Sequence, residues 1–264
     1  MTSICYLCGL PIQGAHPSGD HVVPATLISR SQPKVRGFDY AGKIPTHAEC
    51  NNEFGPETYV LKALDLLELL HSDDGETVYR HRDHPEIEFQ ALDASKLSRF
   101  TARDLAFFKF IDIREEDYGK WMDPGFFDNK SKTNASRDAL MVALSVLAKS
   151  AAALLIKRYL KSVPNLWRIY AAAYVGDTRK LDFDSLLGAT VPFDTDLKVW
   201  IRQMDFANEY LVIYKAGGLL VYLFFLLSSR HEAPEIRQFL SDTDIYCFIG
   251  NCFKDLLNNG WQKI

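Results

Sequence analysis

Cysteine and histidine side chains with the spacing of a metal site lie near the start of this chain. Two residues separate Cys5 from Cys8, and the Gly9 that follows suits the tight turn of a zinc knuckle. His47 and Cys50 are three positions apart, so both side chains would point the same way from a helical turn. A redox pair would instead open a helix in a thioredoxin-like setting. We therefore predict a structural Zn²⁺ site formed by Cys5, Cys8, His47 and Cys50, with buried thiols as the alternative.

An acidic residue and a histidine lie between the two halves of this quartet. Asp20 offers a carboxylate ligand for a hard metal ion, and His21 offers a base within a short β-type run. A lone histidine is more often structural, and the flanking zinc pairs favour the chemical interpretation here. Asn51 follows a zinc ligand directly, whereas Asn52 points about 100° away from it on a helix. We predict that Asp20 and Asn51 bind one Mg²⁺ or Mn²⁺ and leave positions for water and a phosphate oxygen.

The order of these motifs is CxxC, then Asp-His-Val-Val-Pro, then HxxC-Asn-Asn-x-Phe-Gly. It resembles the HNH endonucleases of the ββα-metal (His-Me finger) superfamily, in particular the zinc-bound branch, over about the first 56 residues. The resemblance implies that His21 is the general base, that Asp20 and Asn51 hold the catalytic metal, and that the zinc is structural. In the implied reaction, His21 takes a proton from water and the hydroxide attacks phosphorus in line, while the metal stabilises the leaving 3′-oxygen. Because His21 must be neutral to act as a base, activity is expected to fall at acidic pH.

One position departs from the family pattern. An asparagine just before the second strand often orients the base, but the matching place near Gly42 and Lys43 has none. We expect a backbone carbonyl near Gly42 to orient His21, and an impaired site is the alternative. The rival hypothesis is therefore a catalytically silent zinc module that recruits nucleic acid or protein, which the net charge of -4 also favours.

Basic residues in the loop between the motifs are the predicted substrate contacts. They give this loop a local positive excess, to which phosphates could bind. We expect nucleic acid as the partner, DNA rather than RNA, with a regulatory protein or a second copy of the chain as further partners. A role in bacterial defence rests on family analogy alone. The predicted substrate-binding residues are Arg30, Lys34, Arg36 and Lys43.

The composition is that of a globular protein, with 47% hydrophobic and 24% charged residues. The odd count of 5 cysteines argues against a disulfide framework, and the N-terminus lacks a signal-peptide pattern, so we expect a cytoplasmic location. The apolar stretch from Tyr210 to Leu227 contains Lys215 and a Gly-Gly pair. These residues favour a β-hairpin over a membrane span, and we predict no membrane contact.

The elements that must position the site give an α+β prediction. Residues 1–56 would form the ββα-metal module, and residues 57–264 a mainly α-helical body that contains the hairpin, with the boundary near Gly55-Pro56. Helical spacing that starts at Val60 predicts a helix ending near Ser72. In the longest predicted helix, Lys149 and other basic residues lie toward the end. The other predicted helices are Leu97 to Ile113, Ala135 to Lys161, Asn165 to Val175, Thr195 to Asn208 and Thr243 to Asn258.

Overall fold

The structure is a computed structural model that describes residues 3–13, 18–24, 42–53, 59–71, 129–160, 162–175, 197–204, 209–216, 220–227 and 244–264. The chain divides into two compact units. The first comprises Met1–Glu57 and Leu144–Ile264, and the second comprises Thr58–Ala143. The break after Glu57 lies beside the boundary predicted at Gly55-Pro56, whereas the residues from Leu144 onward join the N-terminal segment in one unit.

The N-terminal part of the first unit consists of two short strands and a helix. Strand β1 (Ser18–His21) pairs antiparallel with β2 (Lys43–Thr46), and helix α1 (Ala48–Glu53) follows. The register places Asp20 opposite Ile44 and His21 opposite Lys43. This strand, strand and helix order agrees with the predicted order of elements.

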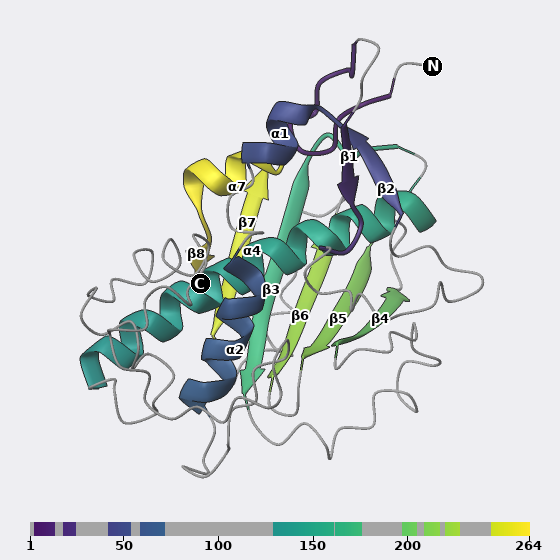
Figure 1. The fold of residues 1–264 in the computed structure, drawn as a ribbon. Helices are drawn as coiled ribbons and strands as arrows, with labels where there is room; N and C mark the ends of the chain where they lie inside the picture. Colours follow the sequence, from purple (N-terminus) through teal and green to yellow (C-terminus); the bar gives the residue numbers. More distant parts are fainter. Residues whose placement is uncertain are drawn as a thin grey trace, which may run out of the picture. The chain divides into compact units, whose positions relative to one another are not determined.

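The first unit also contains a six-stranded antiparallel sheet, in the order β4-β5-β6-β3-β7-β8 (Figure 1). Short helix α7 (Lys254–Asn259) separates the last two strands in the sequence. The hairpin predicted between Tyr210 and Leu227 is confirmed as β5 and β6. The strands are β3 (Trp167–Val175), β4 (Leu197–Gln203), β5 (Tyr210–Ala216), β6 (Leu220–Leu227), β7 (Ile245–Gly250) and β8 (Gln262–Lys263).

Three of the helix predictions are wrong, because the predicted segments contain strands. Residues 167–175 form β3 between two neighbouring strands, and a strand buried on both faces has a continuous apolar sequence that resembles a buried helix. In β4, Val199 and Ile201 share one face, and Lys198 and Arg202 share the other face with the buried Trp200, which gives a strand period that Trp200 interrupts. Residues 245–250 form β7, and only the later part of that predicted helix is helical, as α7. The described residues after Leu144 therefore contain both strands and helices and are not mainly helical.

Helix α4 (Asn129–Arg158) is confirmed, and it begins six residues before the predicted start at Ala135. Its C-terminal part belongs to the first unit and crosses one face of the large sheet (Figure 1). The hydroxyl of Ser150 in this part contacts that of Tyr214 in β5. Lys149 is buried and does not lie with the exposed basic residues near the helix end. The apolar stripe of α4 includes the buried residues Leu144, Leu147, Ala151, Leu154 and Leu155.

In the second unit, helix α2 (Val60–His71) confirms the helix predicted to end near Ser72. It buries Val60, Ala63, Leu64 and Leu67, which follow helical spacing. Among the described helices, the segment Arg137–Arg158 is long and apolar enough to cross a membrane, and 78% of its apolar window is buried. The predicted helix from Leu97 to Ile113 and the predicted phosphate contacts Arg30, Lys34 and Arg36 lie outside the described residues.

Candidate functional site

Backbone hydrogen bonds shape residues 3–13 into a knuckle. The Cys5 amide donates to the Leu10 carbonyl at 2.9 Å, and the Gly9 amide donates to the Cys5 carbonyl at 2.7 Å. Gly9 has φ of +74°, a conformation that a residue with a Cβ atom rarely adopts. An isolated bridge between Ile4 and Pro11 closes the turn. The local sequence thus fixes the positions from which the first two thiols project.

The predicted zinc quartet is brought together. The ligand atoms of the four residues all lie within 4.8 Å of one another. Ligands held tetrahedrally at zinc distances lie about 3.5 Å apart, so only a small closing movement separates this cluster from a zinc site. Three thiols and one imidazole are also a donor set that zinc prefers. The cluster of Cys5, Cys8, His47 and Cys50 therefore fits a structural zinc ion.

The His47 ring is oriented for metal binding. Its Nδ1 atom faces the Cys8 sulfur at 3.3 Å and the Cys50 sulfur at 3.8 Å. Its Nε2 atom lies 3.2 Å from the Pro11 carbonyl oxygen, which can accept the Nε2 proton. A backbone acceptor on one ring nitrogen fixes the tautomer that leaves the other nitrogen free to coordinate. The knuckle thereby orients a ligand that comes from the start of α1.

The buried thiol of Cys50 has a raised proton affinity. Burial is the largest cause, and the hydrogen bond with Cys8 and the nearby Cys5 and Cys8 sulfurs add to it, raising the pKa of Cys50 to about 12. The positive charge of Lys254 acts in the opposite direction. Because a coordinating thiol must be deprotonated, a zinc ion must displace the Cys50 proton when it binds.

The paired strands β1 and β2 place the predicted base and the predicted metal ligand on opposite faces. Successive residues of a strand point to opposite faces, and residues paired directly across an antiparallel sheet share a face. Asp20 and its partner Ile44 are buried, so they form the inner face. His21 is half-buried and its partner Lys43 is exposed, so they form the outer face. The inner and outer faces of the hairpin therefore carry different chemistry.

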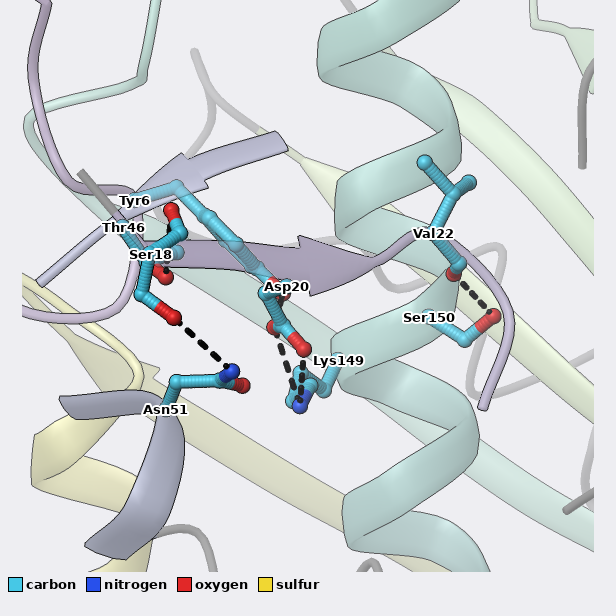
Figure 2. A network of polar contacts seen from close by, with 8 residues as sticks. All are labelled: Tyr6, Ser18, Asp20, Val22, Thr46, Asn51, Lys149 and Ser150. Carbon is cyan, nitrogen blue, oxygen red and sulfur yellow. Dashed lines mark hydrogen bonds and ion pairs between the residues drawn. The ribbon is translucent and has the colours of Figure 1, made fainter. Parts of the chain in front are cut away.

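On the inner face, the Asp20 carboxylate is enclosed by partners from the protein itself (Figure 2). The Lys149 ammonium lies 3.0 Å from Oδ1 and 2.9 Å from Oδ2. The Tyr6 hydroxyl donates a hydrogen bond to Oδ2. The side chain of Asp20 is 1% exposed, and those of Tyr6 and Lys149 are fully buried. This carboxylate therefore has its counter-charge in Lys149.

The surroundings of Asp20 do not fit the divalent site predicted from Asp20 and Asn51. Mg²⁺ in proteins usually keeps several waters of its octahedral shell. A carboxylate that is 1% exposed, with the Lys149 ammonium on both oxygens, leaves no open face for a hydrated ion. The Asn51 amide nitrogen donates to the Ser18 hydroxyl at 3.3 Å, which places this side chain beside β1 (Figure 2), whereas Asn52 is exposed.

On the outer face, Lys43 lies beside His21 and extends across Gly19. A Cβ atom on Gly19 would lie 2.7 Å from the Lys43 Cδ atom and 2.9 Å from its Cβ atom, so glycine leaves the space that this side chain occupies. The Gly42 carbonyl, expected to orient His21, accepts the Val22 amide at 3.0 Å. Among the described residues, no hydrogen bond to the His21 ring is found.

Sequence reasoning missed three residues that hold the strand carrying His21. Lys149 and Ser150 are two adjacent polar residues in an otherwise apolar helical run. Their position in that run was the only sequence signal of a buried role. Tyr6 lies between the two knuckle cysteines, and its ring packs edge-on against Phe253 with the centroids 6.2 Å apart. The knuckle also accepts a hydrogen bond at the Leu7 carbonyl from the Lys254 amide, at 2.9 Å.

Comparison with protein-family models, curated proteins and solved structures finds no match to this chain.

Proposed function

We propose that this chain is a nuclease that hydrolyses phosphodiester bonds in nucleic acid, with His21 as the general base and zinc as a structural ion. The observation that carries the proposal is the convergence of the four predicted zinc ligands, whose donor atoms lie within 4.8 Å of one another. That cluster joins the knuckle before β1 to the start of α1, and it frames the strand that ends in His21. The motif order that resembles HNH endonucleases is thus accompanied by the strand, strand and helix order expected of such a site.

The outer face of the hairpin supplies the chemistry of the proposed reaction. His21 would take a proton from a water molecule, which then attacks phosphorus in line with the leaving 3′-oxygen. Lys43, the register partner of His21, is exposed and would attract the phosphate. Zinc held by the quartet would fix the knuckle and α1, and the steps of the reaction would not involve it. DNA is the substrate we favour, and a protein regulator or a second copy of the chain remains a proposed partner.

A catalytically silent zinc module that binds nucleic acid or protein is the second candidate. The observation in its favour is the Asp20 carboxylate, which pairs with Lys149 in a buried position. A site of the resembled family would use the acidic residue before the histidine for a metal ion. Both candidates contain the same zinc cluster, so only an activity measurement separates them.

The test incubates purified, zinc-loaded protein with supercoiled plasmid and with structured RNA, in Mg²⁺, in Mn²⁺ and in EDTA, with zinc content measured after each incubation. The nuclease proposal expects plasmid cutting by the wild type that His21→Ala removes, while Asn52→Ala, an exposed change on the same module, keeps it. Cutting that survives His21→Ala would overturn the assigned base. Retention of nucleic acid by a wild type that cuts neither substrate would establish the silent module instead.

A further inference from the structure

The residues on either side of His21 are both held by consecutive residues of α4. On one side, Lys149 contacts both carboxylate oxygens of Asp20, at 3.0 and 2.9 Å. On the other side, the Ser150 hydroxyl donates to the Val22 carbonyl at 2.9 Å (Figure 2). All of these groups belong to the same compact unit. The histidine therefore lies between two contacts made by one turn of a single helix.

These two contacts continue into other parts of the unit. The Tyr214 hydroxyl of β5 donates to the Ser150 oxygen at 2.9 Å, so this serine is held in turn by the large sheet. Tyr6 connects Asp20 to the zinc knuckle through its hydroxyl. Tyr214, Tyr6 and Ser150 are all fully buried. A hydroxyl that both accepts and donates in a buried position has one defined orientation, because any rotation leaves a polar group without its partner.

The segment around His21 is thereby held by two elements, β2 and α4. Strand β2 pairs with it on one edge, since His21 lies opposite Lys43 and the Val22 amide donates to the Gly42 carbonyl at 3.0 Å. Lys149 and Ser150 hold the neighbouring residues from α4. These contacts set the position of the His21 backbone without contacting the imidazole.

We infer that Asp20 is a buried anchor rather than a metal ligand, and that Lys149 and Ser150 are positioning residues for His21. The positioning role rests on the proposed function, because it presumes that His21 is the base, whereas the anchor role concerns the fold alone. A buried ion pair that loses one partner leaves an uncompensated charge, but loss of both partners leaves none. Asp20 and Lys149 should therefore depend on each other, and a metal ligand would not show that dependence.

A double-mutant cycle tests the anchor. Lys149→Met and Asp20→Asn should each lower the Tm of the zinc-loaded protein by about 10 °C, because each removes one of the two opposite charges of the buried pair. The double variant should recover most of that loss. Lys157→Met, an exposed lysine change on the same helix, is the matched control and should change the Tm only slightly, because contacts of an exposed lysine contribute little to stability. Additive losses in the double variant would overturn the anchor.

Mn²⁺ titration followed by electron paramagnetic resonance tests the metal-ligand alternative without any activity measurement. The zinc-loaded wild type and the double variant should show the same bound fraction of Mn²⁺. A tightly bound Mn²⁺ in the wild type that Asp20→Asn abolishes, with the Tm retained, would identify Asp20 as a metal ligand and overturn the inference. Neither this titration nor the Tm cycle depends on cleavage, so both test the anchor role even if the wild type cuts no nucleic acid. A wrong anchor role can therefore be distinguished from a wrong nuclease proposal.

Cleavage kinetics test the positioning role. Ser150→Ala should lower kcat by about tenfold to a hundredfold and leave KM unchanged, since a small displacement of the base affects the chemical step and not substrate binding. The pH profile should also change in shape, and the double variant of Asp20 and Lys149 should keep a measurable kcat. An unchanged kcat and pH profile in a folded Ser150→Ala protein would overturn the positioning role. A folded double variant with no cleavage would show that Asp20 itself takes part in catalysis.

Discussion

The zinc cluster and the Asp20 cluster both hold the strand that carries His21, but they satisfy their charges in different ways. The zinc cluster gathers three thiols and an imidazole, a set of metal-binding donors. The Asp20 cluster gathers a carboxylate, an ammonium and a phenol, so its charges are balanced within the protein. A group of metal-binding residue types therefore indicates a metal site only where no side chain of the protein provides the balancing positive charge. The two clusters meet at Tyr6, which lies between the knuckle cysteines and donates to Asp20.

Removal of zinc should have the largest effect, because structural zinc contributes on the order of 10 kcal/mol of folding free energy in small zinc modules. Cys50→Ser should lose the zinc and the hydrogen-exchange protection of β1, since the knuckle would no longer hold Tyr6 against Asp20. Elemental analysis and hydrogen exchange measure both results. Cys252→Ser, a half-buried thiol outside the quartet, is the control and should retain one zinc per chain. Retained protection of β1 in a zinc-free Cys50→Ser protein would contradict the dependence of the Asp20 cluster on the zinc cluster.

Tyr6→Phe should have an intermediate effect, because it removes the hydroxyl on the buried Asp20 carboxylate and leaves the ring in place. The expected loss in the free energy of unfolding is about 1–3 kcal/mol, with zinc content unchanged. Chemical denaturation measures the loss, and Tyr159→Phe, at an exposed position, should change it little. A zinc content that falls together with stability would show that the two clusters are one cooperative site.

Gly19→Ala should have the smallest effect on stability and a local effect on the outer face. The added methyl group would lie 2.7 Å from the Lys43 side chain, so that side chain must move away from its place beside His21. We expect KM for nucleic acid to rise by a few-fold and the free energy of unfolding to change by less than about 1 kcal/mol. In a Lys43→Gly background, which removes both of the Lys43 atoms that the methyl group would meet, the same substitution should have no further effect on KM. A full effect in that background would mean that Gly19 acts through another group.

The sequence allowed prediction of the parts that depend on local spacing. The zinc ligands lie in two short motifs, and the hairpin of β5 and β6 has a clear turn signal, so both could be recognised from neighbouring residues. Strand β3 could not, because its apolar run gives no period that separates a buried strand from a buried helix.

The Asp20 cluster shows the limit for long-range contacts. Lys149 lies 129 positions from Asp20, and the helical pattern around it predicts only a helix, not the partner that its ammonium meets. The same holds for Ser150, which is 128 positions from Val22. The residue types near His21 therefore indicated a metal ion as the partner of the carboxylate. In the tertiary fold, a lysine is that partner.

The measurement that tests the central claim most directly is the single-turnover rate at which zinc-loaded protein cuts an end-labelled DNA duplex, for the wild type and for His21→Ala. If His21 is the base, the rate should fall by about 10²- to 10⁴-fold, with the zinc content and Tm of the two proteins equal. The wild-type products should carry 5′-phosphate and 3′-hydroxyl ends, as attack by water with a 3′-oxygen leaving group requires. Equal rates for the two proteins would contradict the assignment of His21 and, with it, the proposed nuclease site.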